Sequence, residues 1–142
     1  MTELNKAIDL LGEKQATCVI VSGDNVLLSH ERGVKPLLKI IDEQIDVKGA
    51  FAADKVVGKA AAMLYVLLGI RELYASVISE LAIEALERYG VEVSYATRVP
   101  MIRNRTDTGF CPMEQATKDI DDPKDALLAI RKKLYELEAL SK

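Results

Sequence analysis

The sequence of 142 residues has little of the material that several kinds of scaffold and site require. Its two cysteines, Cys18 and Cys111, are too few for a disulfide scaffold. Because His30 is the single histidine, any Ser-His-Asp or Cys-His arrangement must use it. One histidine and two distant cysteines also make a zinc site unexpected. The sequence therefore predicts no metal site and no cofactor.

No segment suggests a membrane span or a secretion signal. The longest apolar run, residues 60–68, is far shorter than the ~20 residues that cross a bilayer. The first six residues lack a basic stretch followed by an apolar one, so no signal peptide is apparent. A formal net charge of -3 argues against broad nucleic-acid binding, which needs clustered lysine and arginine. We expect a reduced, cytoplasmic setting, no membrane partner and no non-specific nucleic-acid binding.

The sequence does contain an ordinary globular balance, with 49% hydrophobic and 29% charged residues, and its length predicts a single domain over residues 1–142. Helix and strand patterns alternate, which predicts an α/β fold with three α-β-α layers, a mixed sheet of four to five strands and helices on both faces. The predicted strands are 17–21, 26–30, 73–78 and 91–96, with 101–103 as a possible fifth. The predicted helices are 3–11, 36–41, 55–68, 80–89 and 123–137.

The start of the central helix carries charges that helix energetics disfavour. Asp54 is expected to be its N-cap, which places Lys55 in the first turn and Lys59 one turn later. Cations there are disfavoured by roughly 0.3–1 kcal/mol each, and two lysines at i,i+4 repel each other. Gly58 costs about 1 kcal/mol relative to alanine. This pattern predicts an anion site, although a plain Asp54 N-cap with solvated lysines explains it equally simply.

The same stretch is not a P-loop, because alanine stands where that motif needs its first glycine and its serine or threonine. A second candidate group lies in the irregular segment before the last helix, and loops of this composition often carry function. Its arginines are suited to gripping an anion, and its cysteine is a possible nucleophile if a cation or a helix N-terminus stabilises the thiolate. Alternatively it is a surface loop with a small buried cysteine. Its polar members include Arg103, Asn104, Arg105, Cys111 and Glu114.

Other polar residues have structural interpretations. His30 lies at a strand end beside charged neighbours, and we interpret it as a partly exposed loop residue. Cys18 alternates with apolar neighbours and is expected in the core. Tyr65 and Tyr74 are expected to pack in the interior, with each hydroxyl reaching a polar edge.

The predicted order of elements resembles the cytidine-deaminase-like fold, in which a hairpin is followed by a buried helix and then by strand, helix and strand. In that superfamily a His/Cys-x-Glu motif begins the central helix and a Pro-Cys-x-x-Cys motif begins the next, and together they hold a catalytic zinc. In this chain the two places are taken by Ala53-Asp54-Lys55 and Ser79-Glu80-Leu81-Ala82. Neither retains the zinc-binding motif.

Most of the chain is more specifically similar to a small, divergent bacterial family of unknown function in that superfamily. The segments that carry this resemblance are residues 53–61 and 109–114. The resemblance implies a pocket at the N-termini of the two helices that would bear the metal. It places Asp54, Lys55 and Ser79 at that pocket, where helix termini bind anions without a metal.

We therefore expect a metal-independent pocket for a small anionic ligand, a nucleotide or related metabolite, with catalysis as an open possibility. If the protein is an enzyme, we expect Asp54 or Glu114 to transfer protons and Cys111 or a lysine of lowered pKa to act as the nucleophile. The arginines would then stabilise charge. The alternative is a deaminase-like scaffold without catalysis that serves as a protein-interaction or regulatory module. A homo-oligomer is possible in either case. The catalytic candidates are Asp54, Lys59, Cys111 and Glu114, and the ligand-binding candidates are Lys55, Ser79, Arg103, Asn104 and Arg105.

Overall fold

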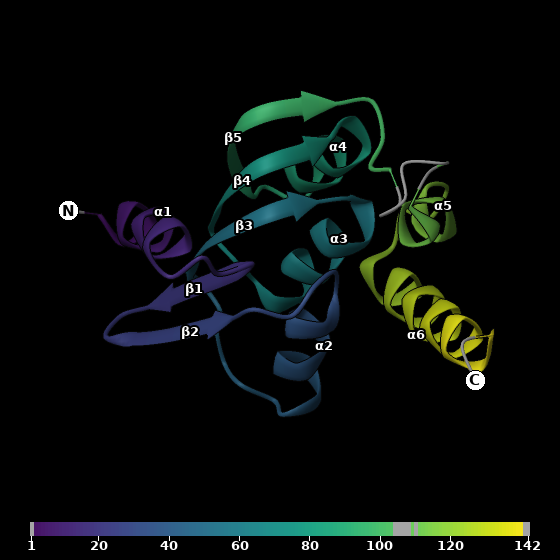
Figure 1. Ribbon diagram of the computed structural model, residues 1–142, viewed down its shortest axis with the longest axis horizontal. Helices are drawn as coiled ribbons and strands as arrows, with labels where there is room; N and C mark the ends of the chain where they lie inside the picture. The colour runs from purple at the N-terminus through teal and green to yellow at the C-terminus, as the bar shows by residue number, and fades with distance from the viewer. Residues whose placement is uncertain (1, 104–108, 110, 141–142) are drawn as a thin grey trace.

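The computed structural model describes residues 2–103, 109 and 111–140. At its centre is one mixed sheet with the strand order β2-β1-β3-β4-β5 (Figure 1). β1 pairs antiparallel with both β2 and β3, whereas β3, β4 and β5 are parallel to one another. The strands are β1 (Cys18–Ser22), β2 (Asn25–Ser29), β3 (Phe51–Val57), β4 (Glu72–Ser79) and β5 (Glu92–Val99).

Helices cover both faces of the sheet, so the predicted three-layer α/β fold is confirmed. On one face α1 packs through Ala7 and Leu11 against β1 and β3. The other face carries α2, α3 and α4, and α6 packs onto α3 and α5 (Figure 1). The helices are α1 (Glu3–Glu13), α2 (Lys35–Asp42), α3 (Lys59–Leu68), α4 (Glu80–Arg88), α5 (Pro112–Thr117) and α6 (Pro123–Leu140). Within the described residues, no helix is long and apolar enough to span a membrane.

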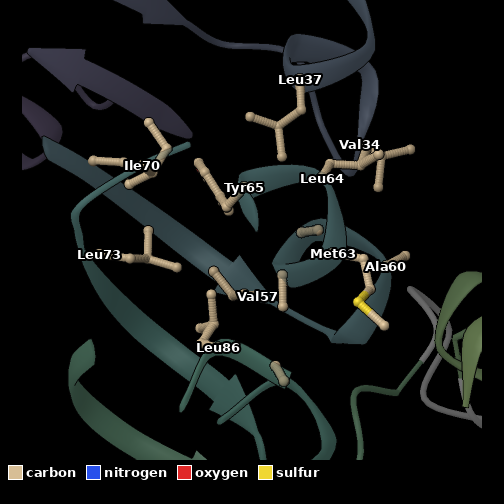
Figure 2. Close-up of a cluster of buried hydrophobic side chains, with 14 of the residues drawn as sticks. Val34, Leu37, Val57, Ala60, Met63, Leu64, Tyr65, Ile70, Leu73 and Leu86 are labelled. Carbon is tan, nitrogen blue, oxygen red and sulfur yellow. The ribbon is translucent and has the colours of Figure 1, made fainter. Parts of the chain in front are cut away.

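The larger core lies around α3, whose first seven residues are all buried. Fully burying each large aliphatic side chain there contributes roughly 1.5–3 kcal/mol, which explains why the helix is apolar nearly all round. Gly69 ends it in the left-handed conformation, with φ 74°. Figure 2 shows the apolar side chains that meet in this core, among them Leu37 of α2, Leu64 of α3, Leu73 of β4 and Leu86 of α4.

Local capping residues mark several helix starts as the sequence predicts. The side chain of Thr2 accepts a hydrogen bond from the backbone N–H of Asn5 at 3.0 Å, at the start of α1. Asp122 accepts one from the backbone N–H of Lys124 at 2.7 Å, at the start of α6. Each bond satisfies one of the free N–H groups of a first turn, which is why these short polar residues favour the position.

The central helix begins later than predicted, and the sheet gains a strand there. Asp54 and Lys55 lie in β3, so Asp54 is not an N-cap and Lys55 is not in a first helical turn. α3 begins at Lys59 with Gly58 as its N-cap, and the expected i,i+4 repulsion between the two lysines does not exist. The fifth strand is β3 rather than residues 101–103.

The prediction failed there because β3 has a weak strand pattern of its own. Its sequence begins Phe51-Ala52-Ala53-Asp54, and alanine and aspartate are both depleted in strands. The segment is nevertheless a strand because it pairs on both edges, with β1 on one side and β4 on the other. Pairing with distant partners therefore overrides the local preference.

Candidate functional site

The structure separates the predicted site residues into two groups, the first of which contains Asp54. Its carboxylate points from β3 towards α3, where the hydroxyl of Tyr65 donates a hydrogen bond to Oδ2 at 2.6 Å. The Sγ atom of Cys18 on β1 lies 3.2 Å from the same hydroxyl oxygen. Because the Tyr65 proton is already given to Asp54, the thiol is the donor in that contact. The three side chains form one buried chain of hydrogen bonds that runs from Cys18 to Tyr65 to Asp54.

Burial shifts the titration of this chain strongly. Loss of solvent raises the pKa of Asp54 from 3.8 to about 7, although the hydrogen bond from Tyr65 and the backbone N–H of Val56 act to lower it. Burial likewise raises the pKa of the Cys18 thiol, which keeps it protonated as the donor. Burial and the neighbouring carboxylate both raise the pKa of Tyr65. Of these three hydrogen-bonded side chains, Asp54 is therefore the one that exchanges a proton near neutral pH.

Asp54 borders a pocket of about 380 Å³ with a basic rim. Arg32, Lys55 and Arg103 all line the pocket, and all three are exposed. Thr17 also lines the pocket, and its hydroxyl lies within hydrogen-bonding distance of the backbone oxygens of Ser29 and Glu31. We name this hollow the Asp54 pocket. Its lining contains a buried acid, three cationic residues and the exposed Glu31.

The second group lies at the N-termini of α3 and α4 and centres on Glu114, which is 1% exposed. Its Oε1 accepts a hydrogen bond from the hydroxyl of Ser79 at 2.6 Å. Its Oε2 accepts one from the backbone N–H of Lys59 at 3.2 Å. Ser79 is in turn the N-cap of α4 and accepts from the backbone N–H of Ala82. A single carboxylate from α5 thus caps α3 directly and α4 through a serine.

Lys59 completes this second group from its other end. Lys59 is 6% exposed, and its ammonium donates to the backbone oxygen of Lys118, the C-cap of α5, at 2.8 Å. A cation there also complements the partial negative charge of that helix end. Lys59 and Glu114 together attach both ends of α5 to the start of α3, and we call this arrangement the α5 clamp.

Gly58 is the position that leaves room for the clamp. A β-carbon built on it would lie 2.1 Å from Oε2 of Glu114, which is closer than real contacts allow. Burial raises the pKa of Glu114, while Ser79 and Lys59 oppose that shift. The tip of the central helix is therefore occupied by a carboxyl group of the chain itself.

The remaining predicted residues have separate positions. Lys55 is exposed at the Asp54 pocket, where Arg103 also lies. Cys111 is half-buried at the N-cap of α5 and makes no side-chain capping bond, and its nucleophilic role stays a prediction. Asn104 and Arg105 lie outside the described residues. The structure thus brings Lys59, Ser79 and Glu114 together and places Asp54 in a different environment.

Sequence reasoning missed the hydrogen-bonded partners Cys18 and Tyr65 and the pocket residue Arg32. Cys18 and Tyr65 were interpreted as packing residues, and Arg32 was noted only as a neighbour of the histidine. No pattern in the sequence reveals the pairing of Cys18 with Asp54 across two strands, because their register depends on the sheet. Among the described residues, no three His, Cys, Asp or Glu side chains are grouped as a metal site.

Comparisons with known proteins place the chain in a family. A family model described as "TM1506: Domain of unknown function (DUF1893)" matches residues 6–134. The chain is similar in structure to a DUF1893 family protein, TM1506, from Thermotoga maritima, with 27% identity and a TM-score of 0.85 over 92% of this chain and 89% of that one. A diaminohydroxyphosphoribosylaminopyrimidine deaminase/5-amino-6-(5-phosphoribosylamino)uracil reductase from the same organism matches 66% of this chain and 35% of its own length, with 14% identity and a TM-score of 0.43. No curated protein is significantly similar in sequence. Because the family model spans most of the sequence, the chain belongs to the DUF1893 family.

Proposed function

We propose that the protein binds a small anionic metabolite, such as a nucleotide, in the Asp54 pocket without a metal, and that Asp54 exchanges a proton with this ligand. The observation that carries the proposal is a buried carboxyl group with a pKa of about 7 beside a rim of two arginines and a lysine. Groups whose pKa is moved to neutrality in a hollow are frequent at functional sites. The pocket volume also lies in the range of small-molecule sites.

The cationic side chains and the acid of the pocket would have different roles in binding. Arginine side chains present forked donors that match phosphate and carboxylate oxygens, so Arg32 and Arg103 suit the anionic group of a ligand. A charged Asp54 would repel that group, but a protonated Asp54 does not. It can instead give its proton to a basic atom of the ligand, and the resulting carboxylate keeps the hydrogen bond from Tyr65.

The α5 clamp is not part of this proposal. Glu114 already accepts hydrogen bonds from the groups that would otherwise face an anion at the tips of α3 and α4. We therefore assign Lys59, Ser79 and Glu114 a structural role in holding α5. The deaminase-like resemblance stays a prediction from the sequence, and nothing in the proposal depends on it.

Sulfate is a suitable first probe because its charge does not change near neutral pH. We expect sulfate to raise the thermal unfolding midpoint of the native chain, with a ligand at 100 times its Kd adding roughly 2.7 kcal/mol. Arg32→Gln should weaken binding, whereas the matched change Lys132→Gln on α6 should not. Binding should tighten as the pH falls through 7, and that dependence should vanish in Asp54→Asn.

The same measurements distinguish the alternative function. If sulfate, inorganic phosphate and nucleoside monophosphates shift the midpoints of the native chain and of Arg32→Gln by the same amount, or do not shift them, the pocket is not an anion site. A stable homodimer in sedimentation together with that result would favour a protein-interaction module.

A further inference from the structure

We infer that the ligand of this protein carries an apolar, ring-sized group next to its anionic group, and that this apolar group occupies a second chamber adjoining the Asp54 pocket. The inference rests on the proposed function, since the anionic group is the one assigned to the Asp54 pocket. It adds the chemical class of the ligand: an amphipathic anion rather than a bare one.

The second chamber lies between the β1–β2 hairpin and α2 and has a volume of about 470 Å³. Aliphatic side chains make up half of its lining, and all of the lining residues lie between residues 18 and 45. The polar side chains in its lining are Ser29, His30, Glu31, Lys39 and Glu43. We name it the hairpin chamber. Its apolar lining residues are Ile20, Leu27, Leu28, Pro36, Ile40 and Ile45.

The two hollows are neighbours with a shared wall. Cys18 and Glu31 line both the hairpin chamber and the Asp54 pocket. The Cys18 backbone is fixed in the sheet between β2 and β3, and the backbone oxygen of Glu31 accepts a hydrogen bond from Thr17. The two hollows are therefore adjacent, and a ligand long enough to extend past Cys18 and Glu31 would occupy both.

The two spaces differ in chemistry, and the difference defines the ligand. The Asp54 pocket offers cationic and acidic groups, whereas the hairpin chamber offers aliphatic side chains together with polar ones. Two of those side chains, Leu28 and Ile45, are 38% and 37% exposed. An apolar group seated against them would leave water, which favours binding in proportion to the area covered. Polar lining groups suit a ring that carries hydrogen-bonding atoms.

Two probes that differ only in the apolar group test this inference. Inorganic phosphate presents the anion alone, and phenyl phosphate adds one ring. We expect phenyl phosphate to bind the native chain at least about tenfold more tightly by calorimetry, a difference of about 1.4 kcal/mol. Repeating the comparison in Asp54→Asn, at a pH where both probes are mainly dianions, removes differences in the charge of the probes and in the ionisation of Asp54.

A matched pair of variants locates the ring. Leu28 and Val26 lie two residues apart on β2 and are both 38% exposed, but of the two only Leu28 lines the hairpin chamber. Leu28→Gln should remove most of the advantage of phenyl phosphate and leave phosphate binding unchanged. Val26→Gln should alter neither. Arg32→Gln should weaken both probes, because both present the same anion.

The outcomes separate this inference from the proposed function. If both probes bind with equal affinity and Leu28→Gln changes nothing, the inference about the apolar group is wrong and the anion site stands. If phenyl phosphate binds more tightly but Val26→Gln affects it as Leu28→Gln does, the ring is not in the hairpin chamber and the inference is likewise wrong. If neither probe binds, or if Arg32→Gln has no effect on either, the proposed anion site itself is refuted.

Discussion

Replacing Glu114 by alanine should destabilise the protein far more than its position on a six-residue helix suggests. The change leaves the hydroxyl of Ser79 and the backbone N–H of Lys59 without their acceptor in a buried place. A buried donor that loses its partner costs about 1–3 kcal/mol, so the two together cost roughly 2–6 kcal/mol. Burial of the carboxylate is itself unfavourable, as its raised pKa indicates, and removing it returns part of this cost. We expect a net loss of about 2–4 kcal/mol.

Equilibrium unfolding in urea measures this loss directly. With a slope of about 2 kcal/mol per molar urea, the unfolding midpoint should fall by roughly 1–2 M. Gln115→Ala is the matched control, because it alters the neighbouring, exposed residue of the same helix and should change stability by less than about 0.5 kcal/mol. Glu114→Gln should fall between the two, since its amide can accept one bond but turns a donor towards the other group. If Glu114→Ala and Gln115→Ala had equal midpoints, the α5 clamp would not contribute to stability.

Two further changes test the buried acids. The folded-state pKa of Asp54 is about 7 against an ordinary 3.8, so between these pH values the folded state binds more protons than the unfolded state. Protonated Asp54 therefore contributes to stability fully below about pH 4, and this contribution is lost as the pH rises through 7. Asp54→Asn avoids this loss, so in urea titrations its free energy of unfolding should rise by roughly 4 kcal/mol relative to that of the native chain between pH 4 and pH 8. If the difference in unfolding free energy between the two proteins were the same at both pH values, the raised pKa would be contradicted. Gly58→Ala should cost about 1–3 kcal/mol because its β-carbon would overlap Oε2 of Glu114. Combined with Glu114→Ala that cost should largely disappear, whereas additive losses would show that the two side chains do not compete for space.

The parts of the fold that follow local rules were predictable. The caps at Thr2, Ser79 and Asp122 mark helix starts through bonds to N–H groups only two or three residues away. The strand, helix and strand from β4 to β5 form a parallel pair, as their spacing predicts. These features depend on neighbours along the chain, and a single sequence displays such neighbours directly.

The candidate site was predictable only in part. The sequence drew attention to Lys59, Ser79 and Glu114, and the structure does bring them into contact. The predicted pair of Lys55 and Lys59 on one helix is wrong, because Lys55 lies in β3. The partnership of Asp54 with Tyr65 was missed, since residues 54 and 65 were both assigned to one helix rather than to a strand and the helix that packs against it.

The sequence by itself determined the class of the fold, several helix starts and the residues that fill the core around α3, because apolar periodicity and short-range capping depend on consecutive residues. Only the tertiary structure decided that residues 51–57 are a strand, since an alanine-rich segment becomes one by pairing with β1 and β4 on its two sides. That single strand then moved Asp54 from a helix tip into a buried chain with Cys18 and Tyr65, where loss of water rather than local sequence sets its pKa. Environment of this kind is created by residues distant in the chain, so no stretch of consecutive residues specifies it.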